Sequence, residues 1–144
     1  MNARFSLAVH ILCLLAEEPE GRLTSEYLAL SIGANAVVIR RLLATLRRAG
    51  LVSSKSAGGG GWKLAHAPAR ITLNLVRQAV NEGERAKLHR NAPHPDCPVG
   101  RGVRGVLMGV YTRADAAMDR ELAEISVATI LDSVLKMDPT IAIR

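Results

Sequence analysis

The sequence predicts a mainly helical chain that carries one small β-hairpin and one long helix toward its C-terminal end. Apolar residues recur at helical spacing over most of the 144 residues. Only Leu51-Val52-Ser53 and Trp62-Lys63-Leu64 alternate as strands, and the glycine run at 58–61 between them suits a hairpin tip. An apolar content of 49% at this length supports a genuine core and fits one compact unit with an appended helical segment.

Three helices are expected in the first 50 residues. Apolar residues fall one helical turn apart from Phe5 to Glu17, and the Glu-Glu-Pro-Glu-Gly run at its end stops that helix. Thr24 is a favourable N-cap for a short second helix that ends at Gly33. Asn35 then opens the strongest helical pattern of the chain, which the Ala-Gly pair at 49–50 ends. One face of this third helix is apolar, and the opposite face is basic.

Three more helical segments are expected after the hairpin. The first runs from about Ile71 to Val80, where Ile71, Leu75 and Val76 are expected to pack back on the preceding residues. Pro98 suits the first turn of a long helix to about residue 123, and a last helix follows from about Val127 to Leu135. Four glycines weaken the start of the long helix, each by roughly 1 kcal/mol relative to Ala.

The chain is expected to divide into three parts. Residues 1–83 form a domain of helices and hairpin, residues 84–97 form a polar loop broken by two prolines, and residues 98–144 form a helical segment. The long helix of the third part carries an apolar stripe, made of Val99, Val103, Val106, Leu107, Val110, Ala114, Ala117, Met118 and Leu122.

Positive charge is concentrated in the first part of the chain. The net charge is +6, and residues 1–80 carry 10 basic and 4 acidic side chains, whereas the remainder carries 9 of each. No Asp or Glu occurs between Tyr27 and Asn81. A field of one sign over a small module suits a polyanionic partner, because each neutralised phosphate releases condensed counterions. A solvated basic surface is the alternative that charge alone leaves open.

The order of the first elements points to a nucleic-acid reader. Two helices joined by a tight glycine turn, the second with basic residues opposite its core face, have the geometry that places a recognition helix in the major groove. We therefore predict a winged helix-turn-helix domain that binds double-stranded DNA. Its candidate DNA-binding residues in the third helix are Asn35, Val37, Arg40, Arg41, Arg47 and Arg48. Either Arg40 or Arg41 is expected to read guanine, whereas the last two arginines suit phosphate contact or solubility.

The hairpin supplies the remaining candidates. Lys55, Ser56 and Lys63 flank the glycine-rich tip, which can approach the minor groove or the phosphate backbone closely because it lacks side chains. An ordinary flexible turn is the alternative. The tip does not match the phosphate-binding loop of nucleotide-binding proteins, because no Gly-Lys-Ser/Thr sequence follows it and Trp62 stands where that loop has its lysine.

Four stretches together resemble a known family. They are the run from Asn35 to Leu43, Ala-Gly-Leu-Val at 49–52, Gly-Gly-Trp-Lys-Leu-Ala at 60–65 and Ile-Thr-Leu at 71–73. They resemble the bacterial Rrf2 family of winged helix-turn-helix transcription regulators, over about residues 1–140, and the 60–65 stretch is the most specific. The resemblance implies a homodimer in which the long helix near 98–123 crosses its partner, and a palindromic operator. A repressor is the expected mode of action.

The chain departs from that family at three places. Many members hold a [2Fe-2S] cluster on three closely spaced cysteines before the dimerisation helix, whereas this segment has only Cys97. A cluster needs thiolate ligands, which Cys13, expected in the core of the first helix, does not supply. No cluster or other cofactor is therefore expected. Ser56-Ala57 stands where the family's wing carries Arg-Gly, which argues against a minor-groove arginine there, and Trp62 replaces a tyrosine.

Cys97 is the candidate sensor residue. It precedes a proline at a helix start and has His94 nearby, and a helix N-terminus and an imidazolium both lower the pKa of a thiol, although Asp96 opposes them. The surrounding His-Pro-Asp-Cys-Pro-Val run resembles the cluster-free members that have one cysteine here. Cys97 and His94 are therefore candidates for a redox or electrophile sensor, and a capping or packing role for Cys97 is the alternative that we favour. The spacing matches no closed zinc site, so no metal is expected.

Other classes of protein find little support in the sequence. No catalytic Ser, His and Asp arrangement and no HExxH stretch occurs, so no enzyme is expected. An aromatic content of 3% argues against an RNA-binding sheet. Two cysteines make no disulfide framework and residues 5–16 are too few to span a bilayer, so we expect a cytoplasmic protein. Two rivals remain: a winged helix that docks a protein, and a nucleoid protein that binds DNA without sequence preference. The sequence identifies no effector.

Overall fold

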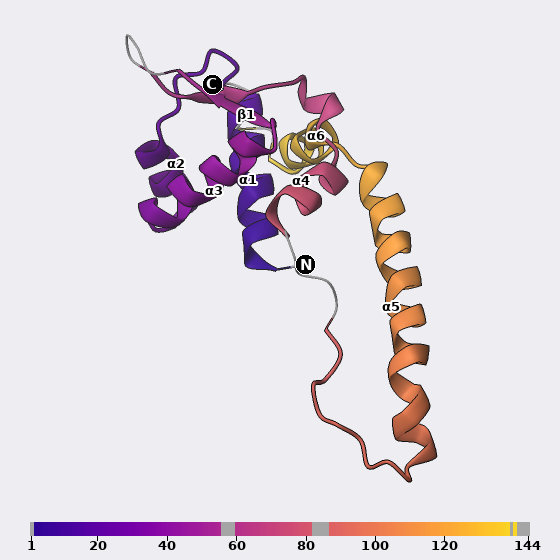
Figure 1. The fold of residues 1–144 in the computed structure, drawn as a ribbon. Helices are drawn as coiled ribbons and strands as arrows, with labels where there is room; N and C mark the ends of the chain where they lie inside the picture. The colour runs from indigo at the N-terminus through magenta and orange to yellow at the C-terminus, as the bar shows by residue number, and fades with distance from the viewer. Residues whose placement is uncertain (1, 56–59, 82–86, 139, 141–144) are drawn as a thin grey trace.

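The computed structural model describes residues 2–55, 60–81, 87–138 and 140 of the chain. Helices α1–α4 and α6 and a two-stranded hairpin form a body. Residues 87–97 run out from this body, and the long helix α5 begins at the far end and returns to it (Figure 1). The expected fold class, mainly helical with one small hairpin and a long helix toward the C-terminal end, is confirmed.

Helix α1 (Ala3–Glu17) runs through the centre of the body. It begins two residues earlier than expected, because the Asn2 side chain accepts a hydrogen bond from the backbone N–H of Phe5 at 3.1 Å and so caps the helix. It contacts α2, α3, α4, α6 and β2. Its buried side chains are Phe5, Ala8, Ile11, Leu12 and Leu15.

Helices α2 (Ser25–Ile32) and α3 (Ala36–Arg48) form the expected helix-turn-helix. Thr24 caps the first, since its side chain accepts from the N–H of Tyr27 at 3.1 Å. Gly33 ends it with φ 72°, a left-handed conformation that favours glycine. No single helix in the described ranges is long and apolar enough to span a membrane; α2 and α3 satisfy length and composition only as a pair, bent by 117°.

Strands β1 (Val52–Ser54) and β2 (Trp62–Leu64) pair antiparallel, with Val52 opposite Leu64. The first strand begins one residue later than expected, because the N–H of Leu51 bonds to Leu46 and so completes the end of α3. The hairpin is fastened to the loop before α2, where the N–H of Trp62 donates to the carbonyl of Leu23 at 2.8 Å. Gly61 permits this contact, since a Cβ there would lie 2.7 Å from the backbone oxygen of Gly21.

A short 3-10 turn (Pro68–Arg70) leads to α4 (Leu73–Val80). The helix starts two residues later than expected, because Thr72 caps it and accepts from the N–H of Leu75 at 3.3 Å. Ile71 is fully buried although it precedes the helix. The expectation that Leu75 packs back on the body is wrong, since its side chain is 43% exposed.

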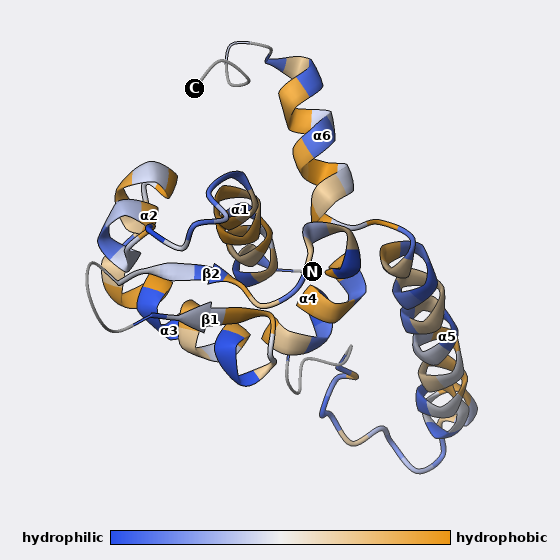
Figure 2. Cartoon of the chain, turned by 90° about the horizontal axis from the view of Figure 1, so that it is seen from above, coloured by the Kyte–Doolittle hydropathy of each residue, from blue (hydrophilic) through white to orange (hydrophobic). Residues whose placement is uncertain are grey.

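Helices α5 (Pro98–Ala123) and α6 (Val127–Met137) complete the chain. The connection between them is fixed to the body by two backbone hydrogen bonds, from Leu73 to the carbonyl of Ile125 and from Val127 to the carbonyl of Ile71. Helix α6 then packs on α1 and ends two residues beyond the expected position. Figure 2 shows α5 standing apart from the body, with apolar and polar residues mixed along its length.

Candidate nucleic-acid interface

Helix α3, the expected recognition helix, buries one face and exposes the other. Its buried side chains are Ile39, Leu42, Leu43, Thr45 and Leu46. The opposite face exposes four of the expected DNA-binding residues near its start, which are Asn35, Val37, Arg40 and Arg41. Val38 is also 41% exposed, which the sequence analysis missed. Its position one turn before Arg41 is the periodic signal that places it on the same face.

Asn35 caps α3. Its side-chain oxygen accepts a hydrogen bond from the N–H of Val37 at 2.8 Å, which satisfies one of the free donors at the helix start. The oxygen of this amide is therefore engaged within the chain, and its amide nitrogen remains the group that can donate to DNA.

Arg40 pairs with an acidic residue of the preceding helix. Its Nη1 lies 3.3 Å from Oε1 of Glu26, and the Oγ of Ser25 donates to the second carboxylate oxygen at 3.2 Å. The pKa of Glu26 is held below its ordinary value. The largest cause is a hydrogen bond from the backbone N–H of Glu26, then the hydrogen bond from Ser25, and the positive charge of Arg40 adds to these. The pair spans the turn between α2 and α3.

Arg47 and Arg48 lie at the end of α3 but contact different groups. The Arg47 guanidinium lies over the ring of Trp62, 5.6 Å from its centre, and donates to Ser54 at 3.4 Å. Arg48 donates to Thr45 on its own helix at 3.3 Å. Arg47 therefore joins the recognition helix to the hairpin, whereas Arg48 stays at the helix surface.

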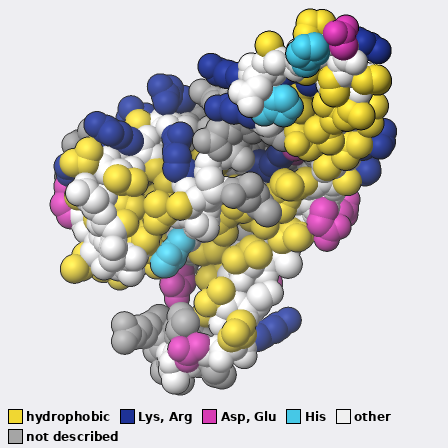
Figure 3. Space-filling model, turned by 90° about the horizontal axis from the view of Figure 1, so that it is seen from below, with side chains coloured by type: hydrophobic (Ala, Val, Ile, Leu, Met, Phe, Trp, Pro, Cys, Tyr) yellow, Lys and Arg dark blue, Asp and Glu magenta, His cyan; other side chains and the backbone are white. Residues whose placement is uncertain are grey.

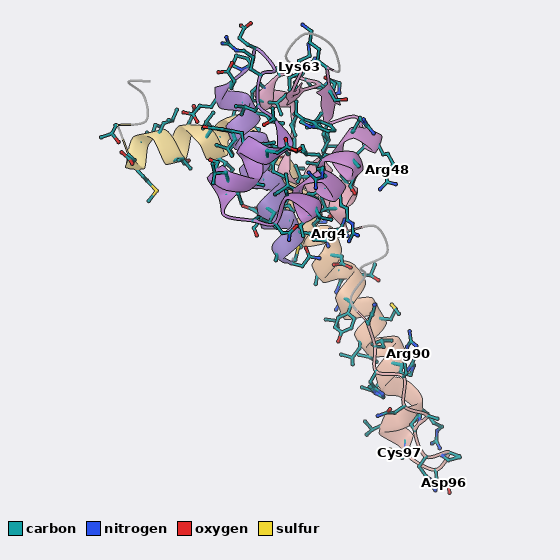
Figure 4. All side chains as sticks on the ribbon, turned by 90° about the vertical axis from the view of Figure 1, so that its left-hand side faces the viewer. Arg4, Arg48, Lys63, Arg90, Asp96 and Cys97 are labelled. Carbon is teal, nitrogen blue, oxygen red and sulfur yellow. The ribbon has the colours of Figure 1, made fainter. Side chains whose placement is uncertain are left out.

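The basic residues of the hairpin are exposed. Lys55 and Lys63 both face solvent, and Ser56 lies outside the described residues. Several Lys and Arg side chains lie on the body near α3, and an apolar surface covers much of α5 (Figure 3). In Figure 4, Lys63 and Arg48 lie on the body, and Cys97 lies at the far end of α5.

Cys97 caps helix α5. Its sulfur accepts a hydrogen bond from the N–H of Gly100 at 3.3 Å, and the side chain is half-buried. The ring of His94 is directed to another residue, since its Nδ1 accepts from the N–H of Asp96 at 3.2 Å. The structure thus places Cys97 in the capping position, and the described contacts of the His94 side chain are with Asp96.

Cys13 lies on α1, at the edge of the core and not inside it as expected. It lines a largely apolar groove between α1 and α6 of about 430 Å³, and burial raises the pKa of its thiol to about 11. The two cysteines of the chain are on different elements, α1 and the start of α5. No group of three or more His, Cys, Asp or Glu side chains suited to a metal occurs among the described residues.

Two sequence comparisons relate the chain to known proteins. The model of the Rrf2 family, described as an iron-dependent transcriptional regulator, matches residues 1–133. A curated relative is YwnA of Bacillus subtilis (strain 168), named as a candidate HTH-type transcriptional regulator. It is 33% identical over 132 residues, which cover 92% of this chain and 97% of YwnA.

Solved structures share the fold over at least 90% of the chain. A crystal structure described as a candidate DNA-binding protein has a TM-score of 0.73 at 31% identity and covers 90% of this chain and 99% of its own. IscR of T. potens has a TM-score of 0.73 at 21% identity, and the match covers 96% of this chain and 90% of the IscR chain. CymR (YrzC), the global cysteine regulator of B. subtilis, has a TM-score of 0.68 at 19% identity, and the match covers 92% of this chain and 96% of the CymR chain.

Proposed function

Because the chain belongs to the Rrf2 family of transcriptional regulators, we propose that it binds a palindromic operator in double-stranded DNA as a homodimer and represses transcription. As a family member it is a DNA-binding regulator and not an enzyme. The observation that carries the proposal is the exposed basic face of α3, which follows the α2 turn and lies beside the hairpin. We place this activity in the cytoplasm, where bacterial DNA is accessible.

Base reading is assigned to the start of α3. A recognition helix contacts base edges through its N-terminal residues, and the exposed side chains there are Val37, Val38, Arg40 and Arg41. An arginine guanidinium binds guanine through two hydrogen bonds, and a valine methyl group contacts the thymine methyl group. Asn35 is left with its amide nitrogen as a donor to DNA.

Phosphate contact is assigned to the end of α3 and to the hairpin. Arg47, Arg48, Lys55 and Lys63 are exposed and basic, and Ser56 belongs to the same proposal although it lies outside the described residues. Each phosphate neutralised by such a residue releases counterions, so the contribution of these residues weakens as salt rises.

The homodimer is supported by the exposed stripe of α5. Of the 26 residues of this helix, all of them described, only Leu122 is buried. Val99 is 72% exposed, Val106 69% and Val110 40%, and they lie on one face with Ala114 and Ala117. An isolated helix with glycines near its start is marginal in water, so a second copy that covers this stripe stabilises both helices. Two-fold symmetry of the protein then requires a palindromic operator.

We propose that the protein works without an iron-sulfur cluster. The family description names iron dependence, but the residues present do not fit a cluster that is bound through cysteine thiolates. The chain has two cysteines on separate elements, and Cys13 keeps its proton because burial raises the pKa of its thiol to about 11. Cys97 with His94 remains the candidate sensor, and the hydrogen bond to Gly100 supports the capping role of Cys97.

The first experiment selects DNA from a random duplex pool with the purified protein and titrates the selected sequence at several salt concentrations. The expected result is a palindrome whose affinity falls steeply with salt, by a slope of about −0.9 per phosphate contact. Binding without a consensus contradicts the proposal in favour of a nucleoid protein, and absence of binding contradicts it in favour of a protein-docking module.

A matched pair of double variants separates specific contacts from general charge. Arg40→Ala with Arg41→Ala is expected to abolish operator binding and leave the circular dichroism spectrum unchanged. Arg4→Ala with Lys136→Ala removes the same charge from exposed positions on α1 and α6 and is expected to retain operator binding. Equal affinities of the two double variants would refute base reading by α3.

A further inference from the structure

One acidic side chain stands on an otherwise basic surface. Glu26, in the first turn of α2, is the only Asp or Glu in α2, the turn and α3, and its side chain is 69% exposed. A carboxylate at this place repels DNA phosphates and weakens binding. Glu26 therefore opposes the DNA binding that we propose for this surface, which indicates that its carboxylate has a role within that binding.

The carboxylate of Glu26 is held from both sides. Ser25, which is 9% exposed and therefore fixed by packing, donates to Oε2 at 3.2 Å. Arg40 donates from Nη1 to Oε1 at 3.3 Å across the turn. Each carboxylate oxygen thus has its own partner, and the chain from Ser25 through Glu26 to Arg40 connects a packed side chain to a guanidinium on the reading face of α3.

We propose that Glu26 is a specificity-determining residue that positions Arg40 for base reading and keeps it from phosphate. This inference rests on the proposed function. A guanidinium has five N–H donors in a fixed plane, so one bond to Glu26 leaves donors for the two acceptors of guanine. A free arginine on this surface binds phosphate of any sequence, because phosphate contacts carry no sequence information. Glu26 therefore lowers the overall affinity and raises the discrimination between sequences.

Folding stability does not account for the pair. Arg40 is 52% exposed and Glu26 69%, and an exposed ion pair of this kind adds little to stability. The main effect of losing the pair is therefore expected in DNA binding. The charge of Glu26 in the first turn of α2 also favours that helix, so Glu26→Gln is expected to lower the unfolding midpoint slightly.

The test compares Glu26→Gln with the parent protein on the selected operator, on random DNA, and on the operator with each guanine replaced in turn. Glu26→Gln is expected to bind random DNA about three- to tenfold more tightly, since it removes one repulsive charge. Discrimination at the base pair that Arg40 reads is expected to fall about tenfold. Glu20→Gln, which removes an exposed charge from the loop before α2, is the control and is expected to change neither quantity.

Two further variants separate positioning from charge. Glu26→Asp keeps the charge but shortens the side chain, so weak binding to random DNA is expected to remain while discrimination is lost. In an Arg40→Ala background, Glu26→Gln is expected to leave discrimination unchanged. If it changes discrimination there, the carboxylate acts on the bases by itself and the positioning role is overturned.

The outcomes for the two proposals are distinguishable. If the parent selects a palindrome and Glu26→Gln selects the same sequence with the same discrimination, the proposed function stands and the role of Glu26 is overturned. If the parent selects no sequence, the proposed function fails, and the role of Glu26 fails with it.

Discussion

Arg77 of α4 and Asp115 of α5 form an ion pair, with Nη2 and Oδ1 3.1 Å apart. The other terminal nitrogen of the guanidinium pairs with Asp119, one turn further along α5, and the arginine side chain is only 16% exposed. Together with the buried Leu122 and the two backbone hydrogen bonds of the α5–α6 connection, this cluster fixes the direction in which the long helix leaves the body. In a dimer that direction also determines the distance between the two recognition helices.

Arg77→Ala is expected to destabilise the fold by about 1.5–3 kcal/mol, the range for hydrogen bonds to charged groups. Arg77→Lys is expected to recover only part of this loss, because an ammonium lacks the planar fork that spans two carboxylates. Urea unfolding followed by circular dichroism measures both. Arg120→Ala, on the exposed face of α5, is the control and is expected to stay within about 0.5 kcal/mol of the parent. A common midpoint for all four proteins would contradict the role of Arg77.

Val106→Asp is expected to dissociate the homodimer, because it places a charge in the middle of the exposed apolar stripe of α5. Analytical ultracentrifugation measures the dissociation constant, and operator affinity is expected to fall with it, since a monomer engages one half-site. Thr112→Asp, on the opposite side of the same helix, is the matched control and is expected to remain dimeric. A parent protein that sediments as a monomer at micromolar concentration would refute the dimer.

Cys97→Ser is expected to be at least as stable as the parent, since a serine hydroxyl caps a helix better than the weakly accepting thiol, whereas Cys97→Ala is expected to lose less than about 1 kcal/mol. The sensor hypothesis is tested on the same proteins by treatment with hydrogen peroxide before operator titration. A sensor requires that the parent loses affinity and Cys97→Ser does not. If both respond equally, the thiol of Cys97 has only its capping role.

The Cys13 thiol is expected to resist alkylation at pH 8. Its pKa is raised from 9.0 to about 11 in the folded state, so the thiolate fraction is roughly a hundredfold lower than in the unfolded chain. The folded state holds the Cys13 thiol proton more firmly than the unfolded chain does. The contribution of this thiol to folding stability is therefore present below pH 9 and is lost as the pH rises toward 11. Iodoacetamide labelling of the Cys97→Ser variant, with and without urea, measures the difference. Equal labelling rates would show that the thiol is not desolvated.

Local signals predicted the helix-turn-helix well. Thr24, Gly33 and Asn35 end or begin helices through hydrogen bonds and backbone angles that involve residues within four positions, so their roles are legible in the sequence. Asn2 acts by the same rule and was missed, because the apolar pattern of α1 starts only at Phe5.

Contacts between elements could not be predicted in the same way. Glu26 and Arg40 are 14 residues apart, and their pairing depends on the angle between two helices. Leu75 matched the helical pattern, but an eight-residue helix gives too few apolar positions to fix which side faces the core. The ion pairs of Arg77, 38 and 42 residues from its partners, had no signal beyond opposite charge.

Trp62 is the only tryptophan of the chain, and it lies where α3, the hairpin and the loop before α2 meet. Its fluorescence therefore originates entirely at this junction, with the Arg47 cation over the indole ring. The intrinsic fluorescence of the protein is therefore a label-free probe of this junction, so that contact of Arg47 with a DNA phosphate can be followed in real time.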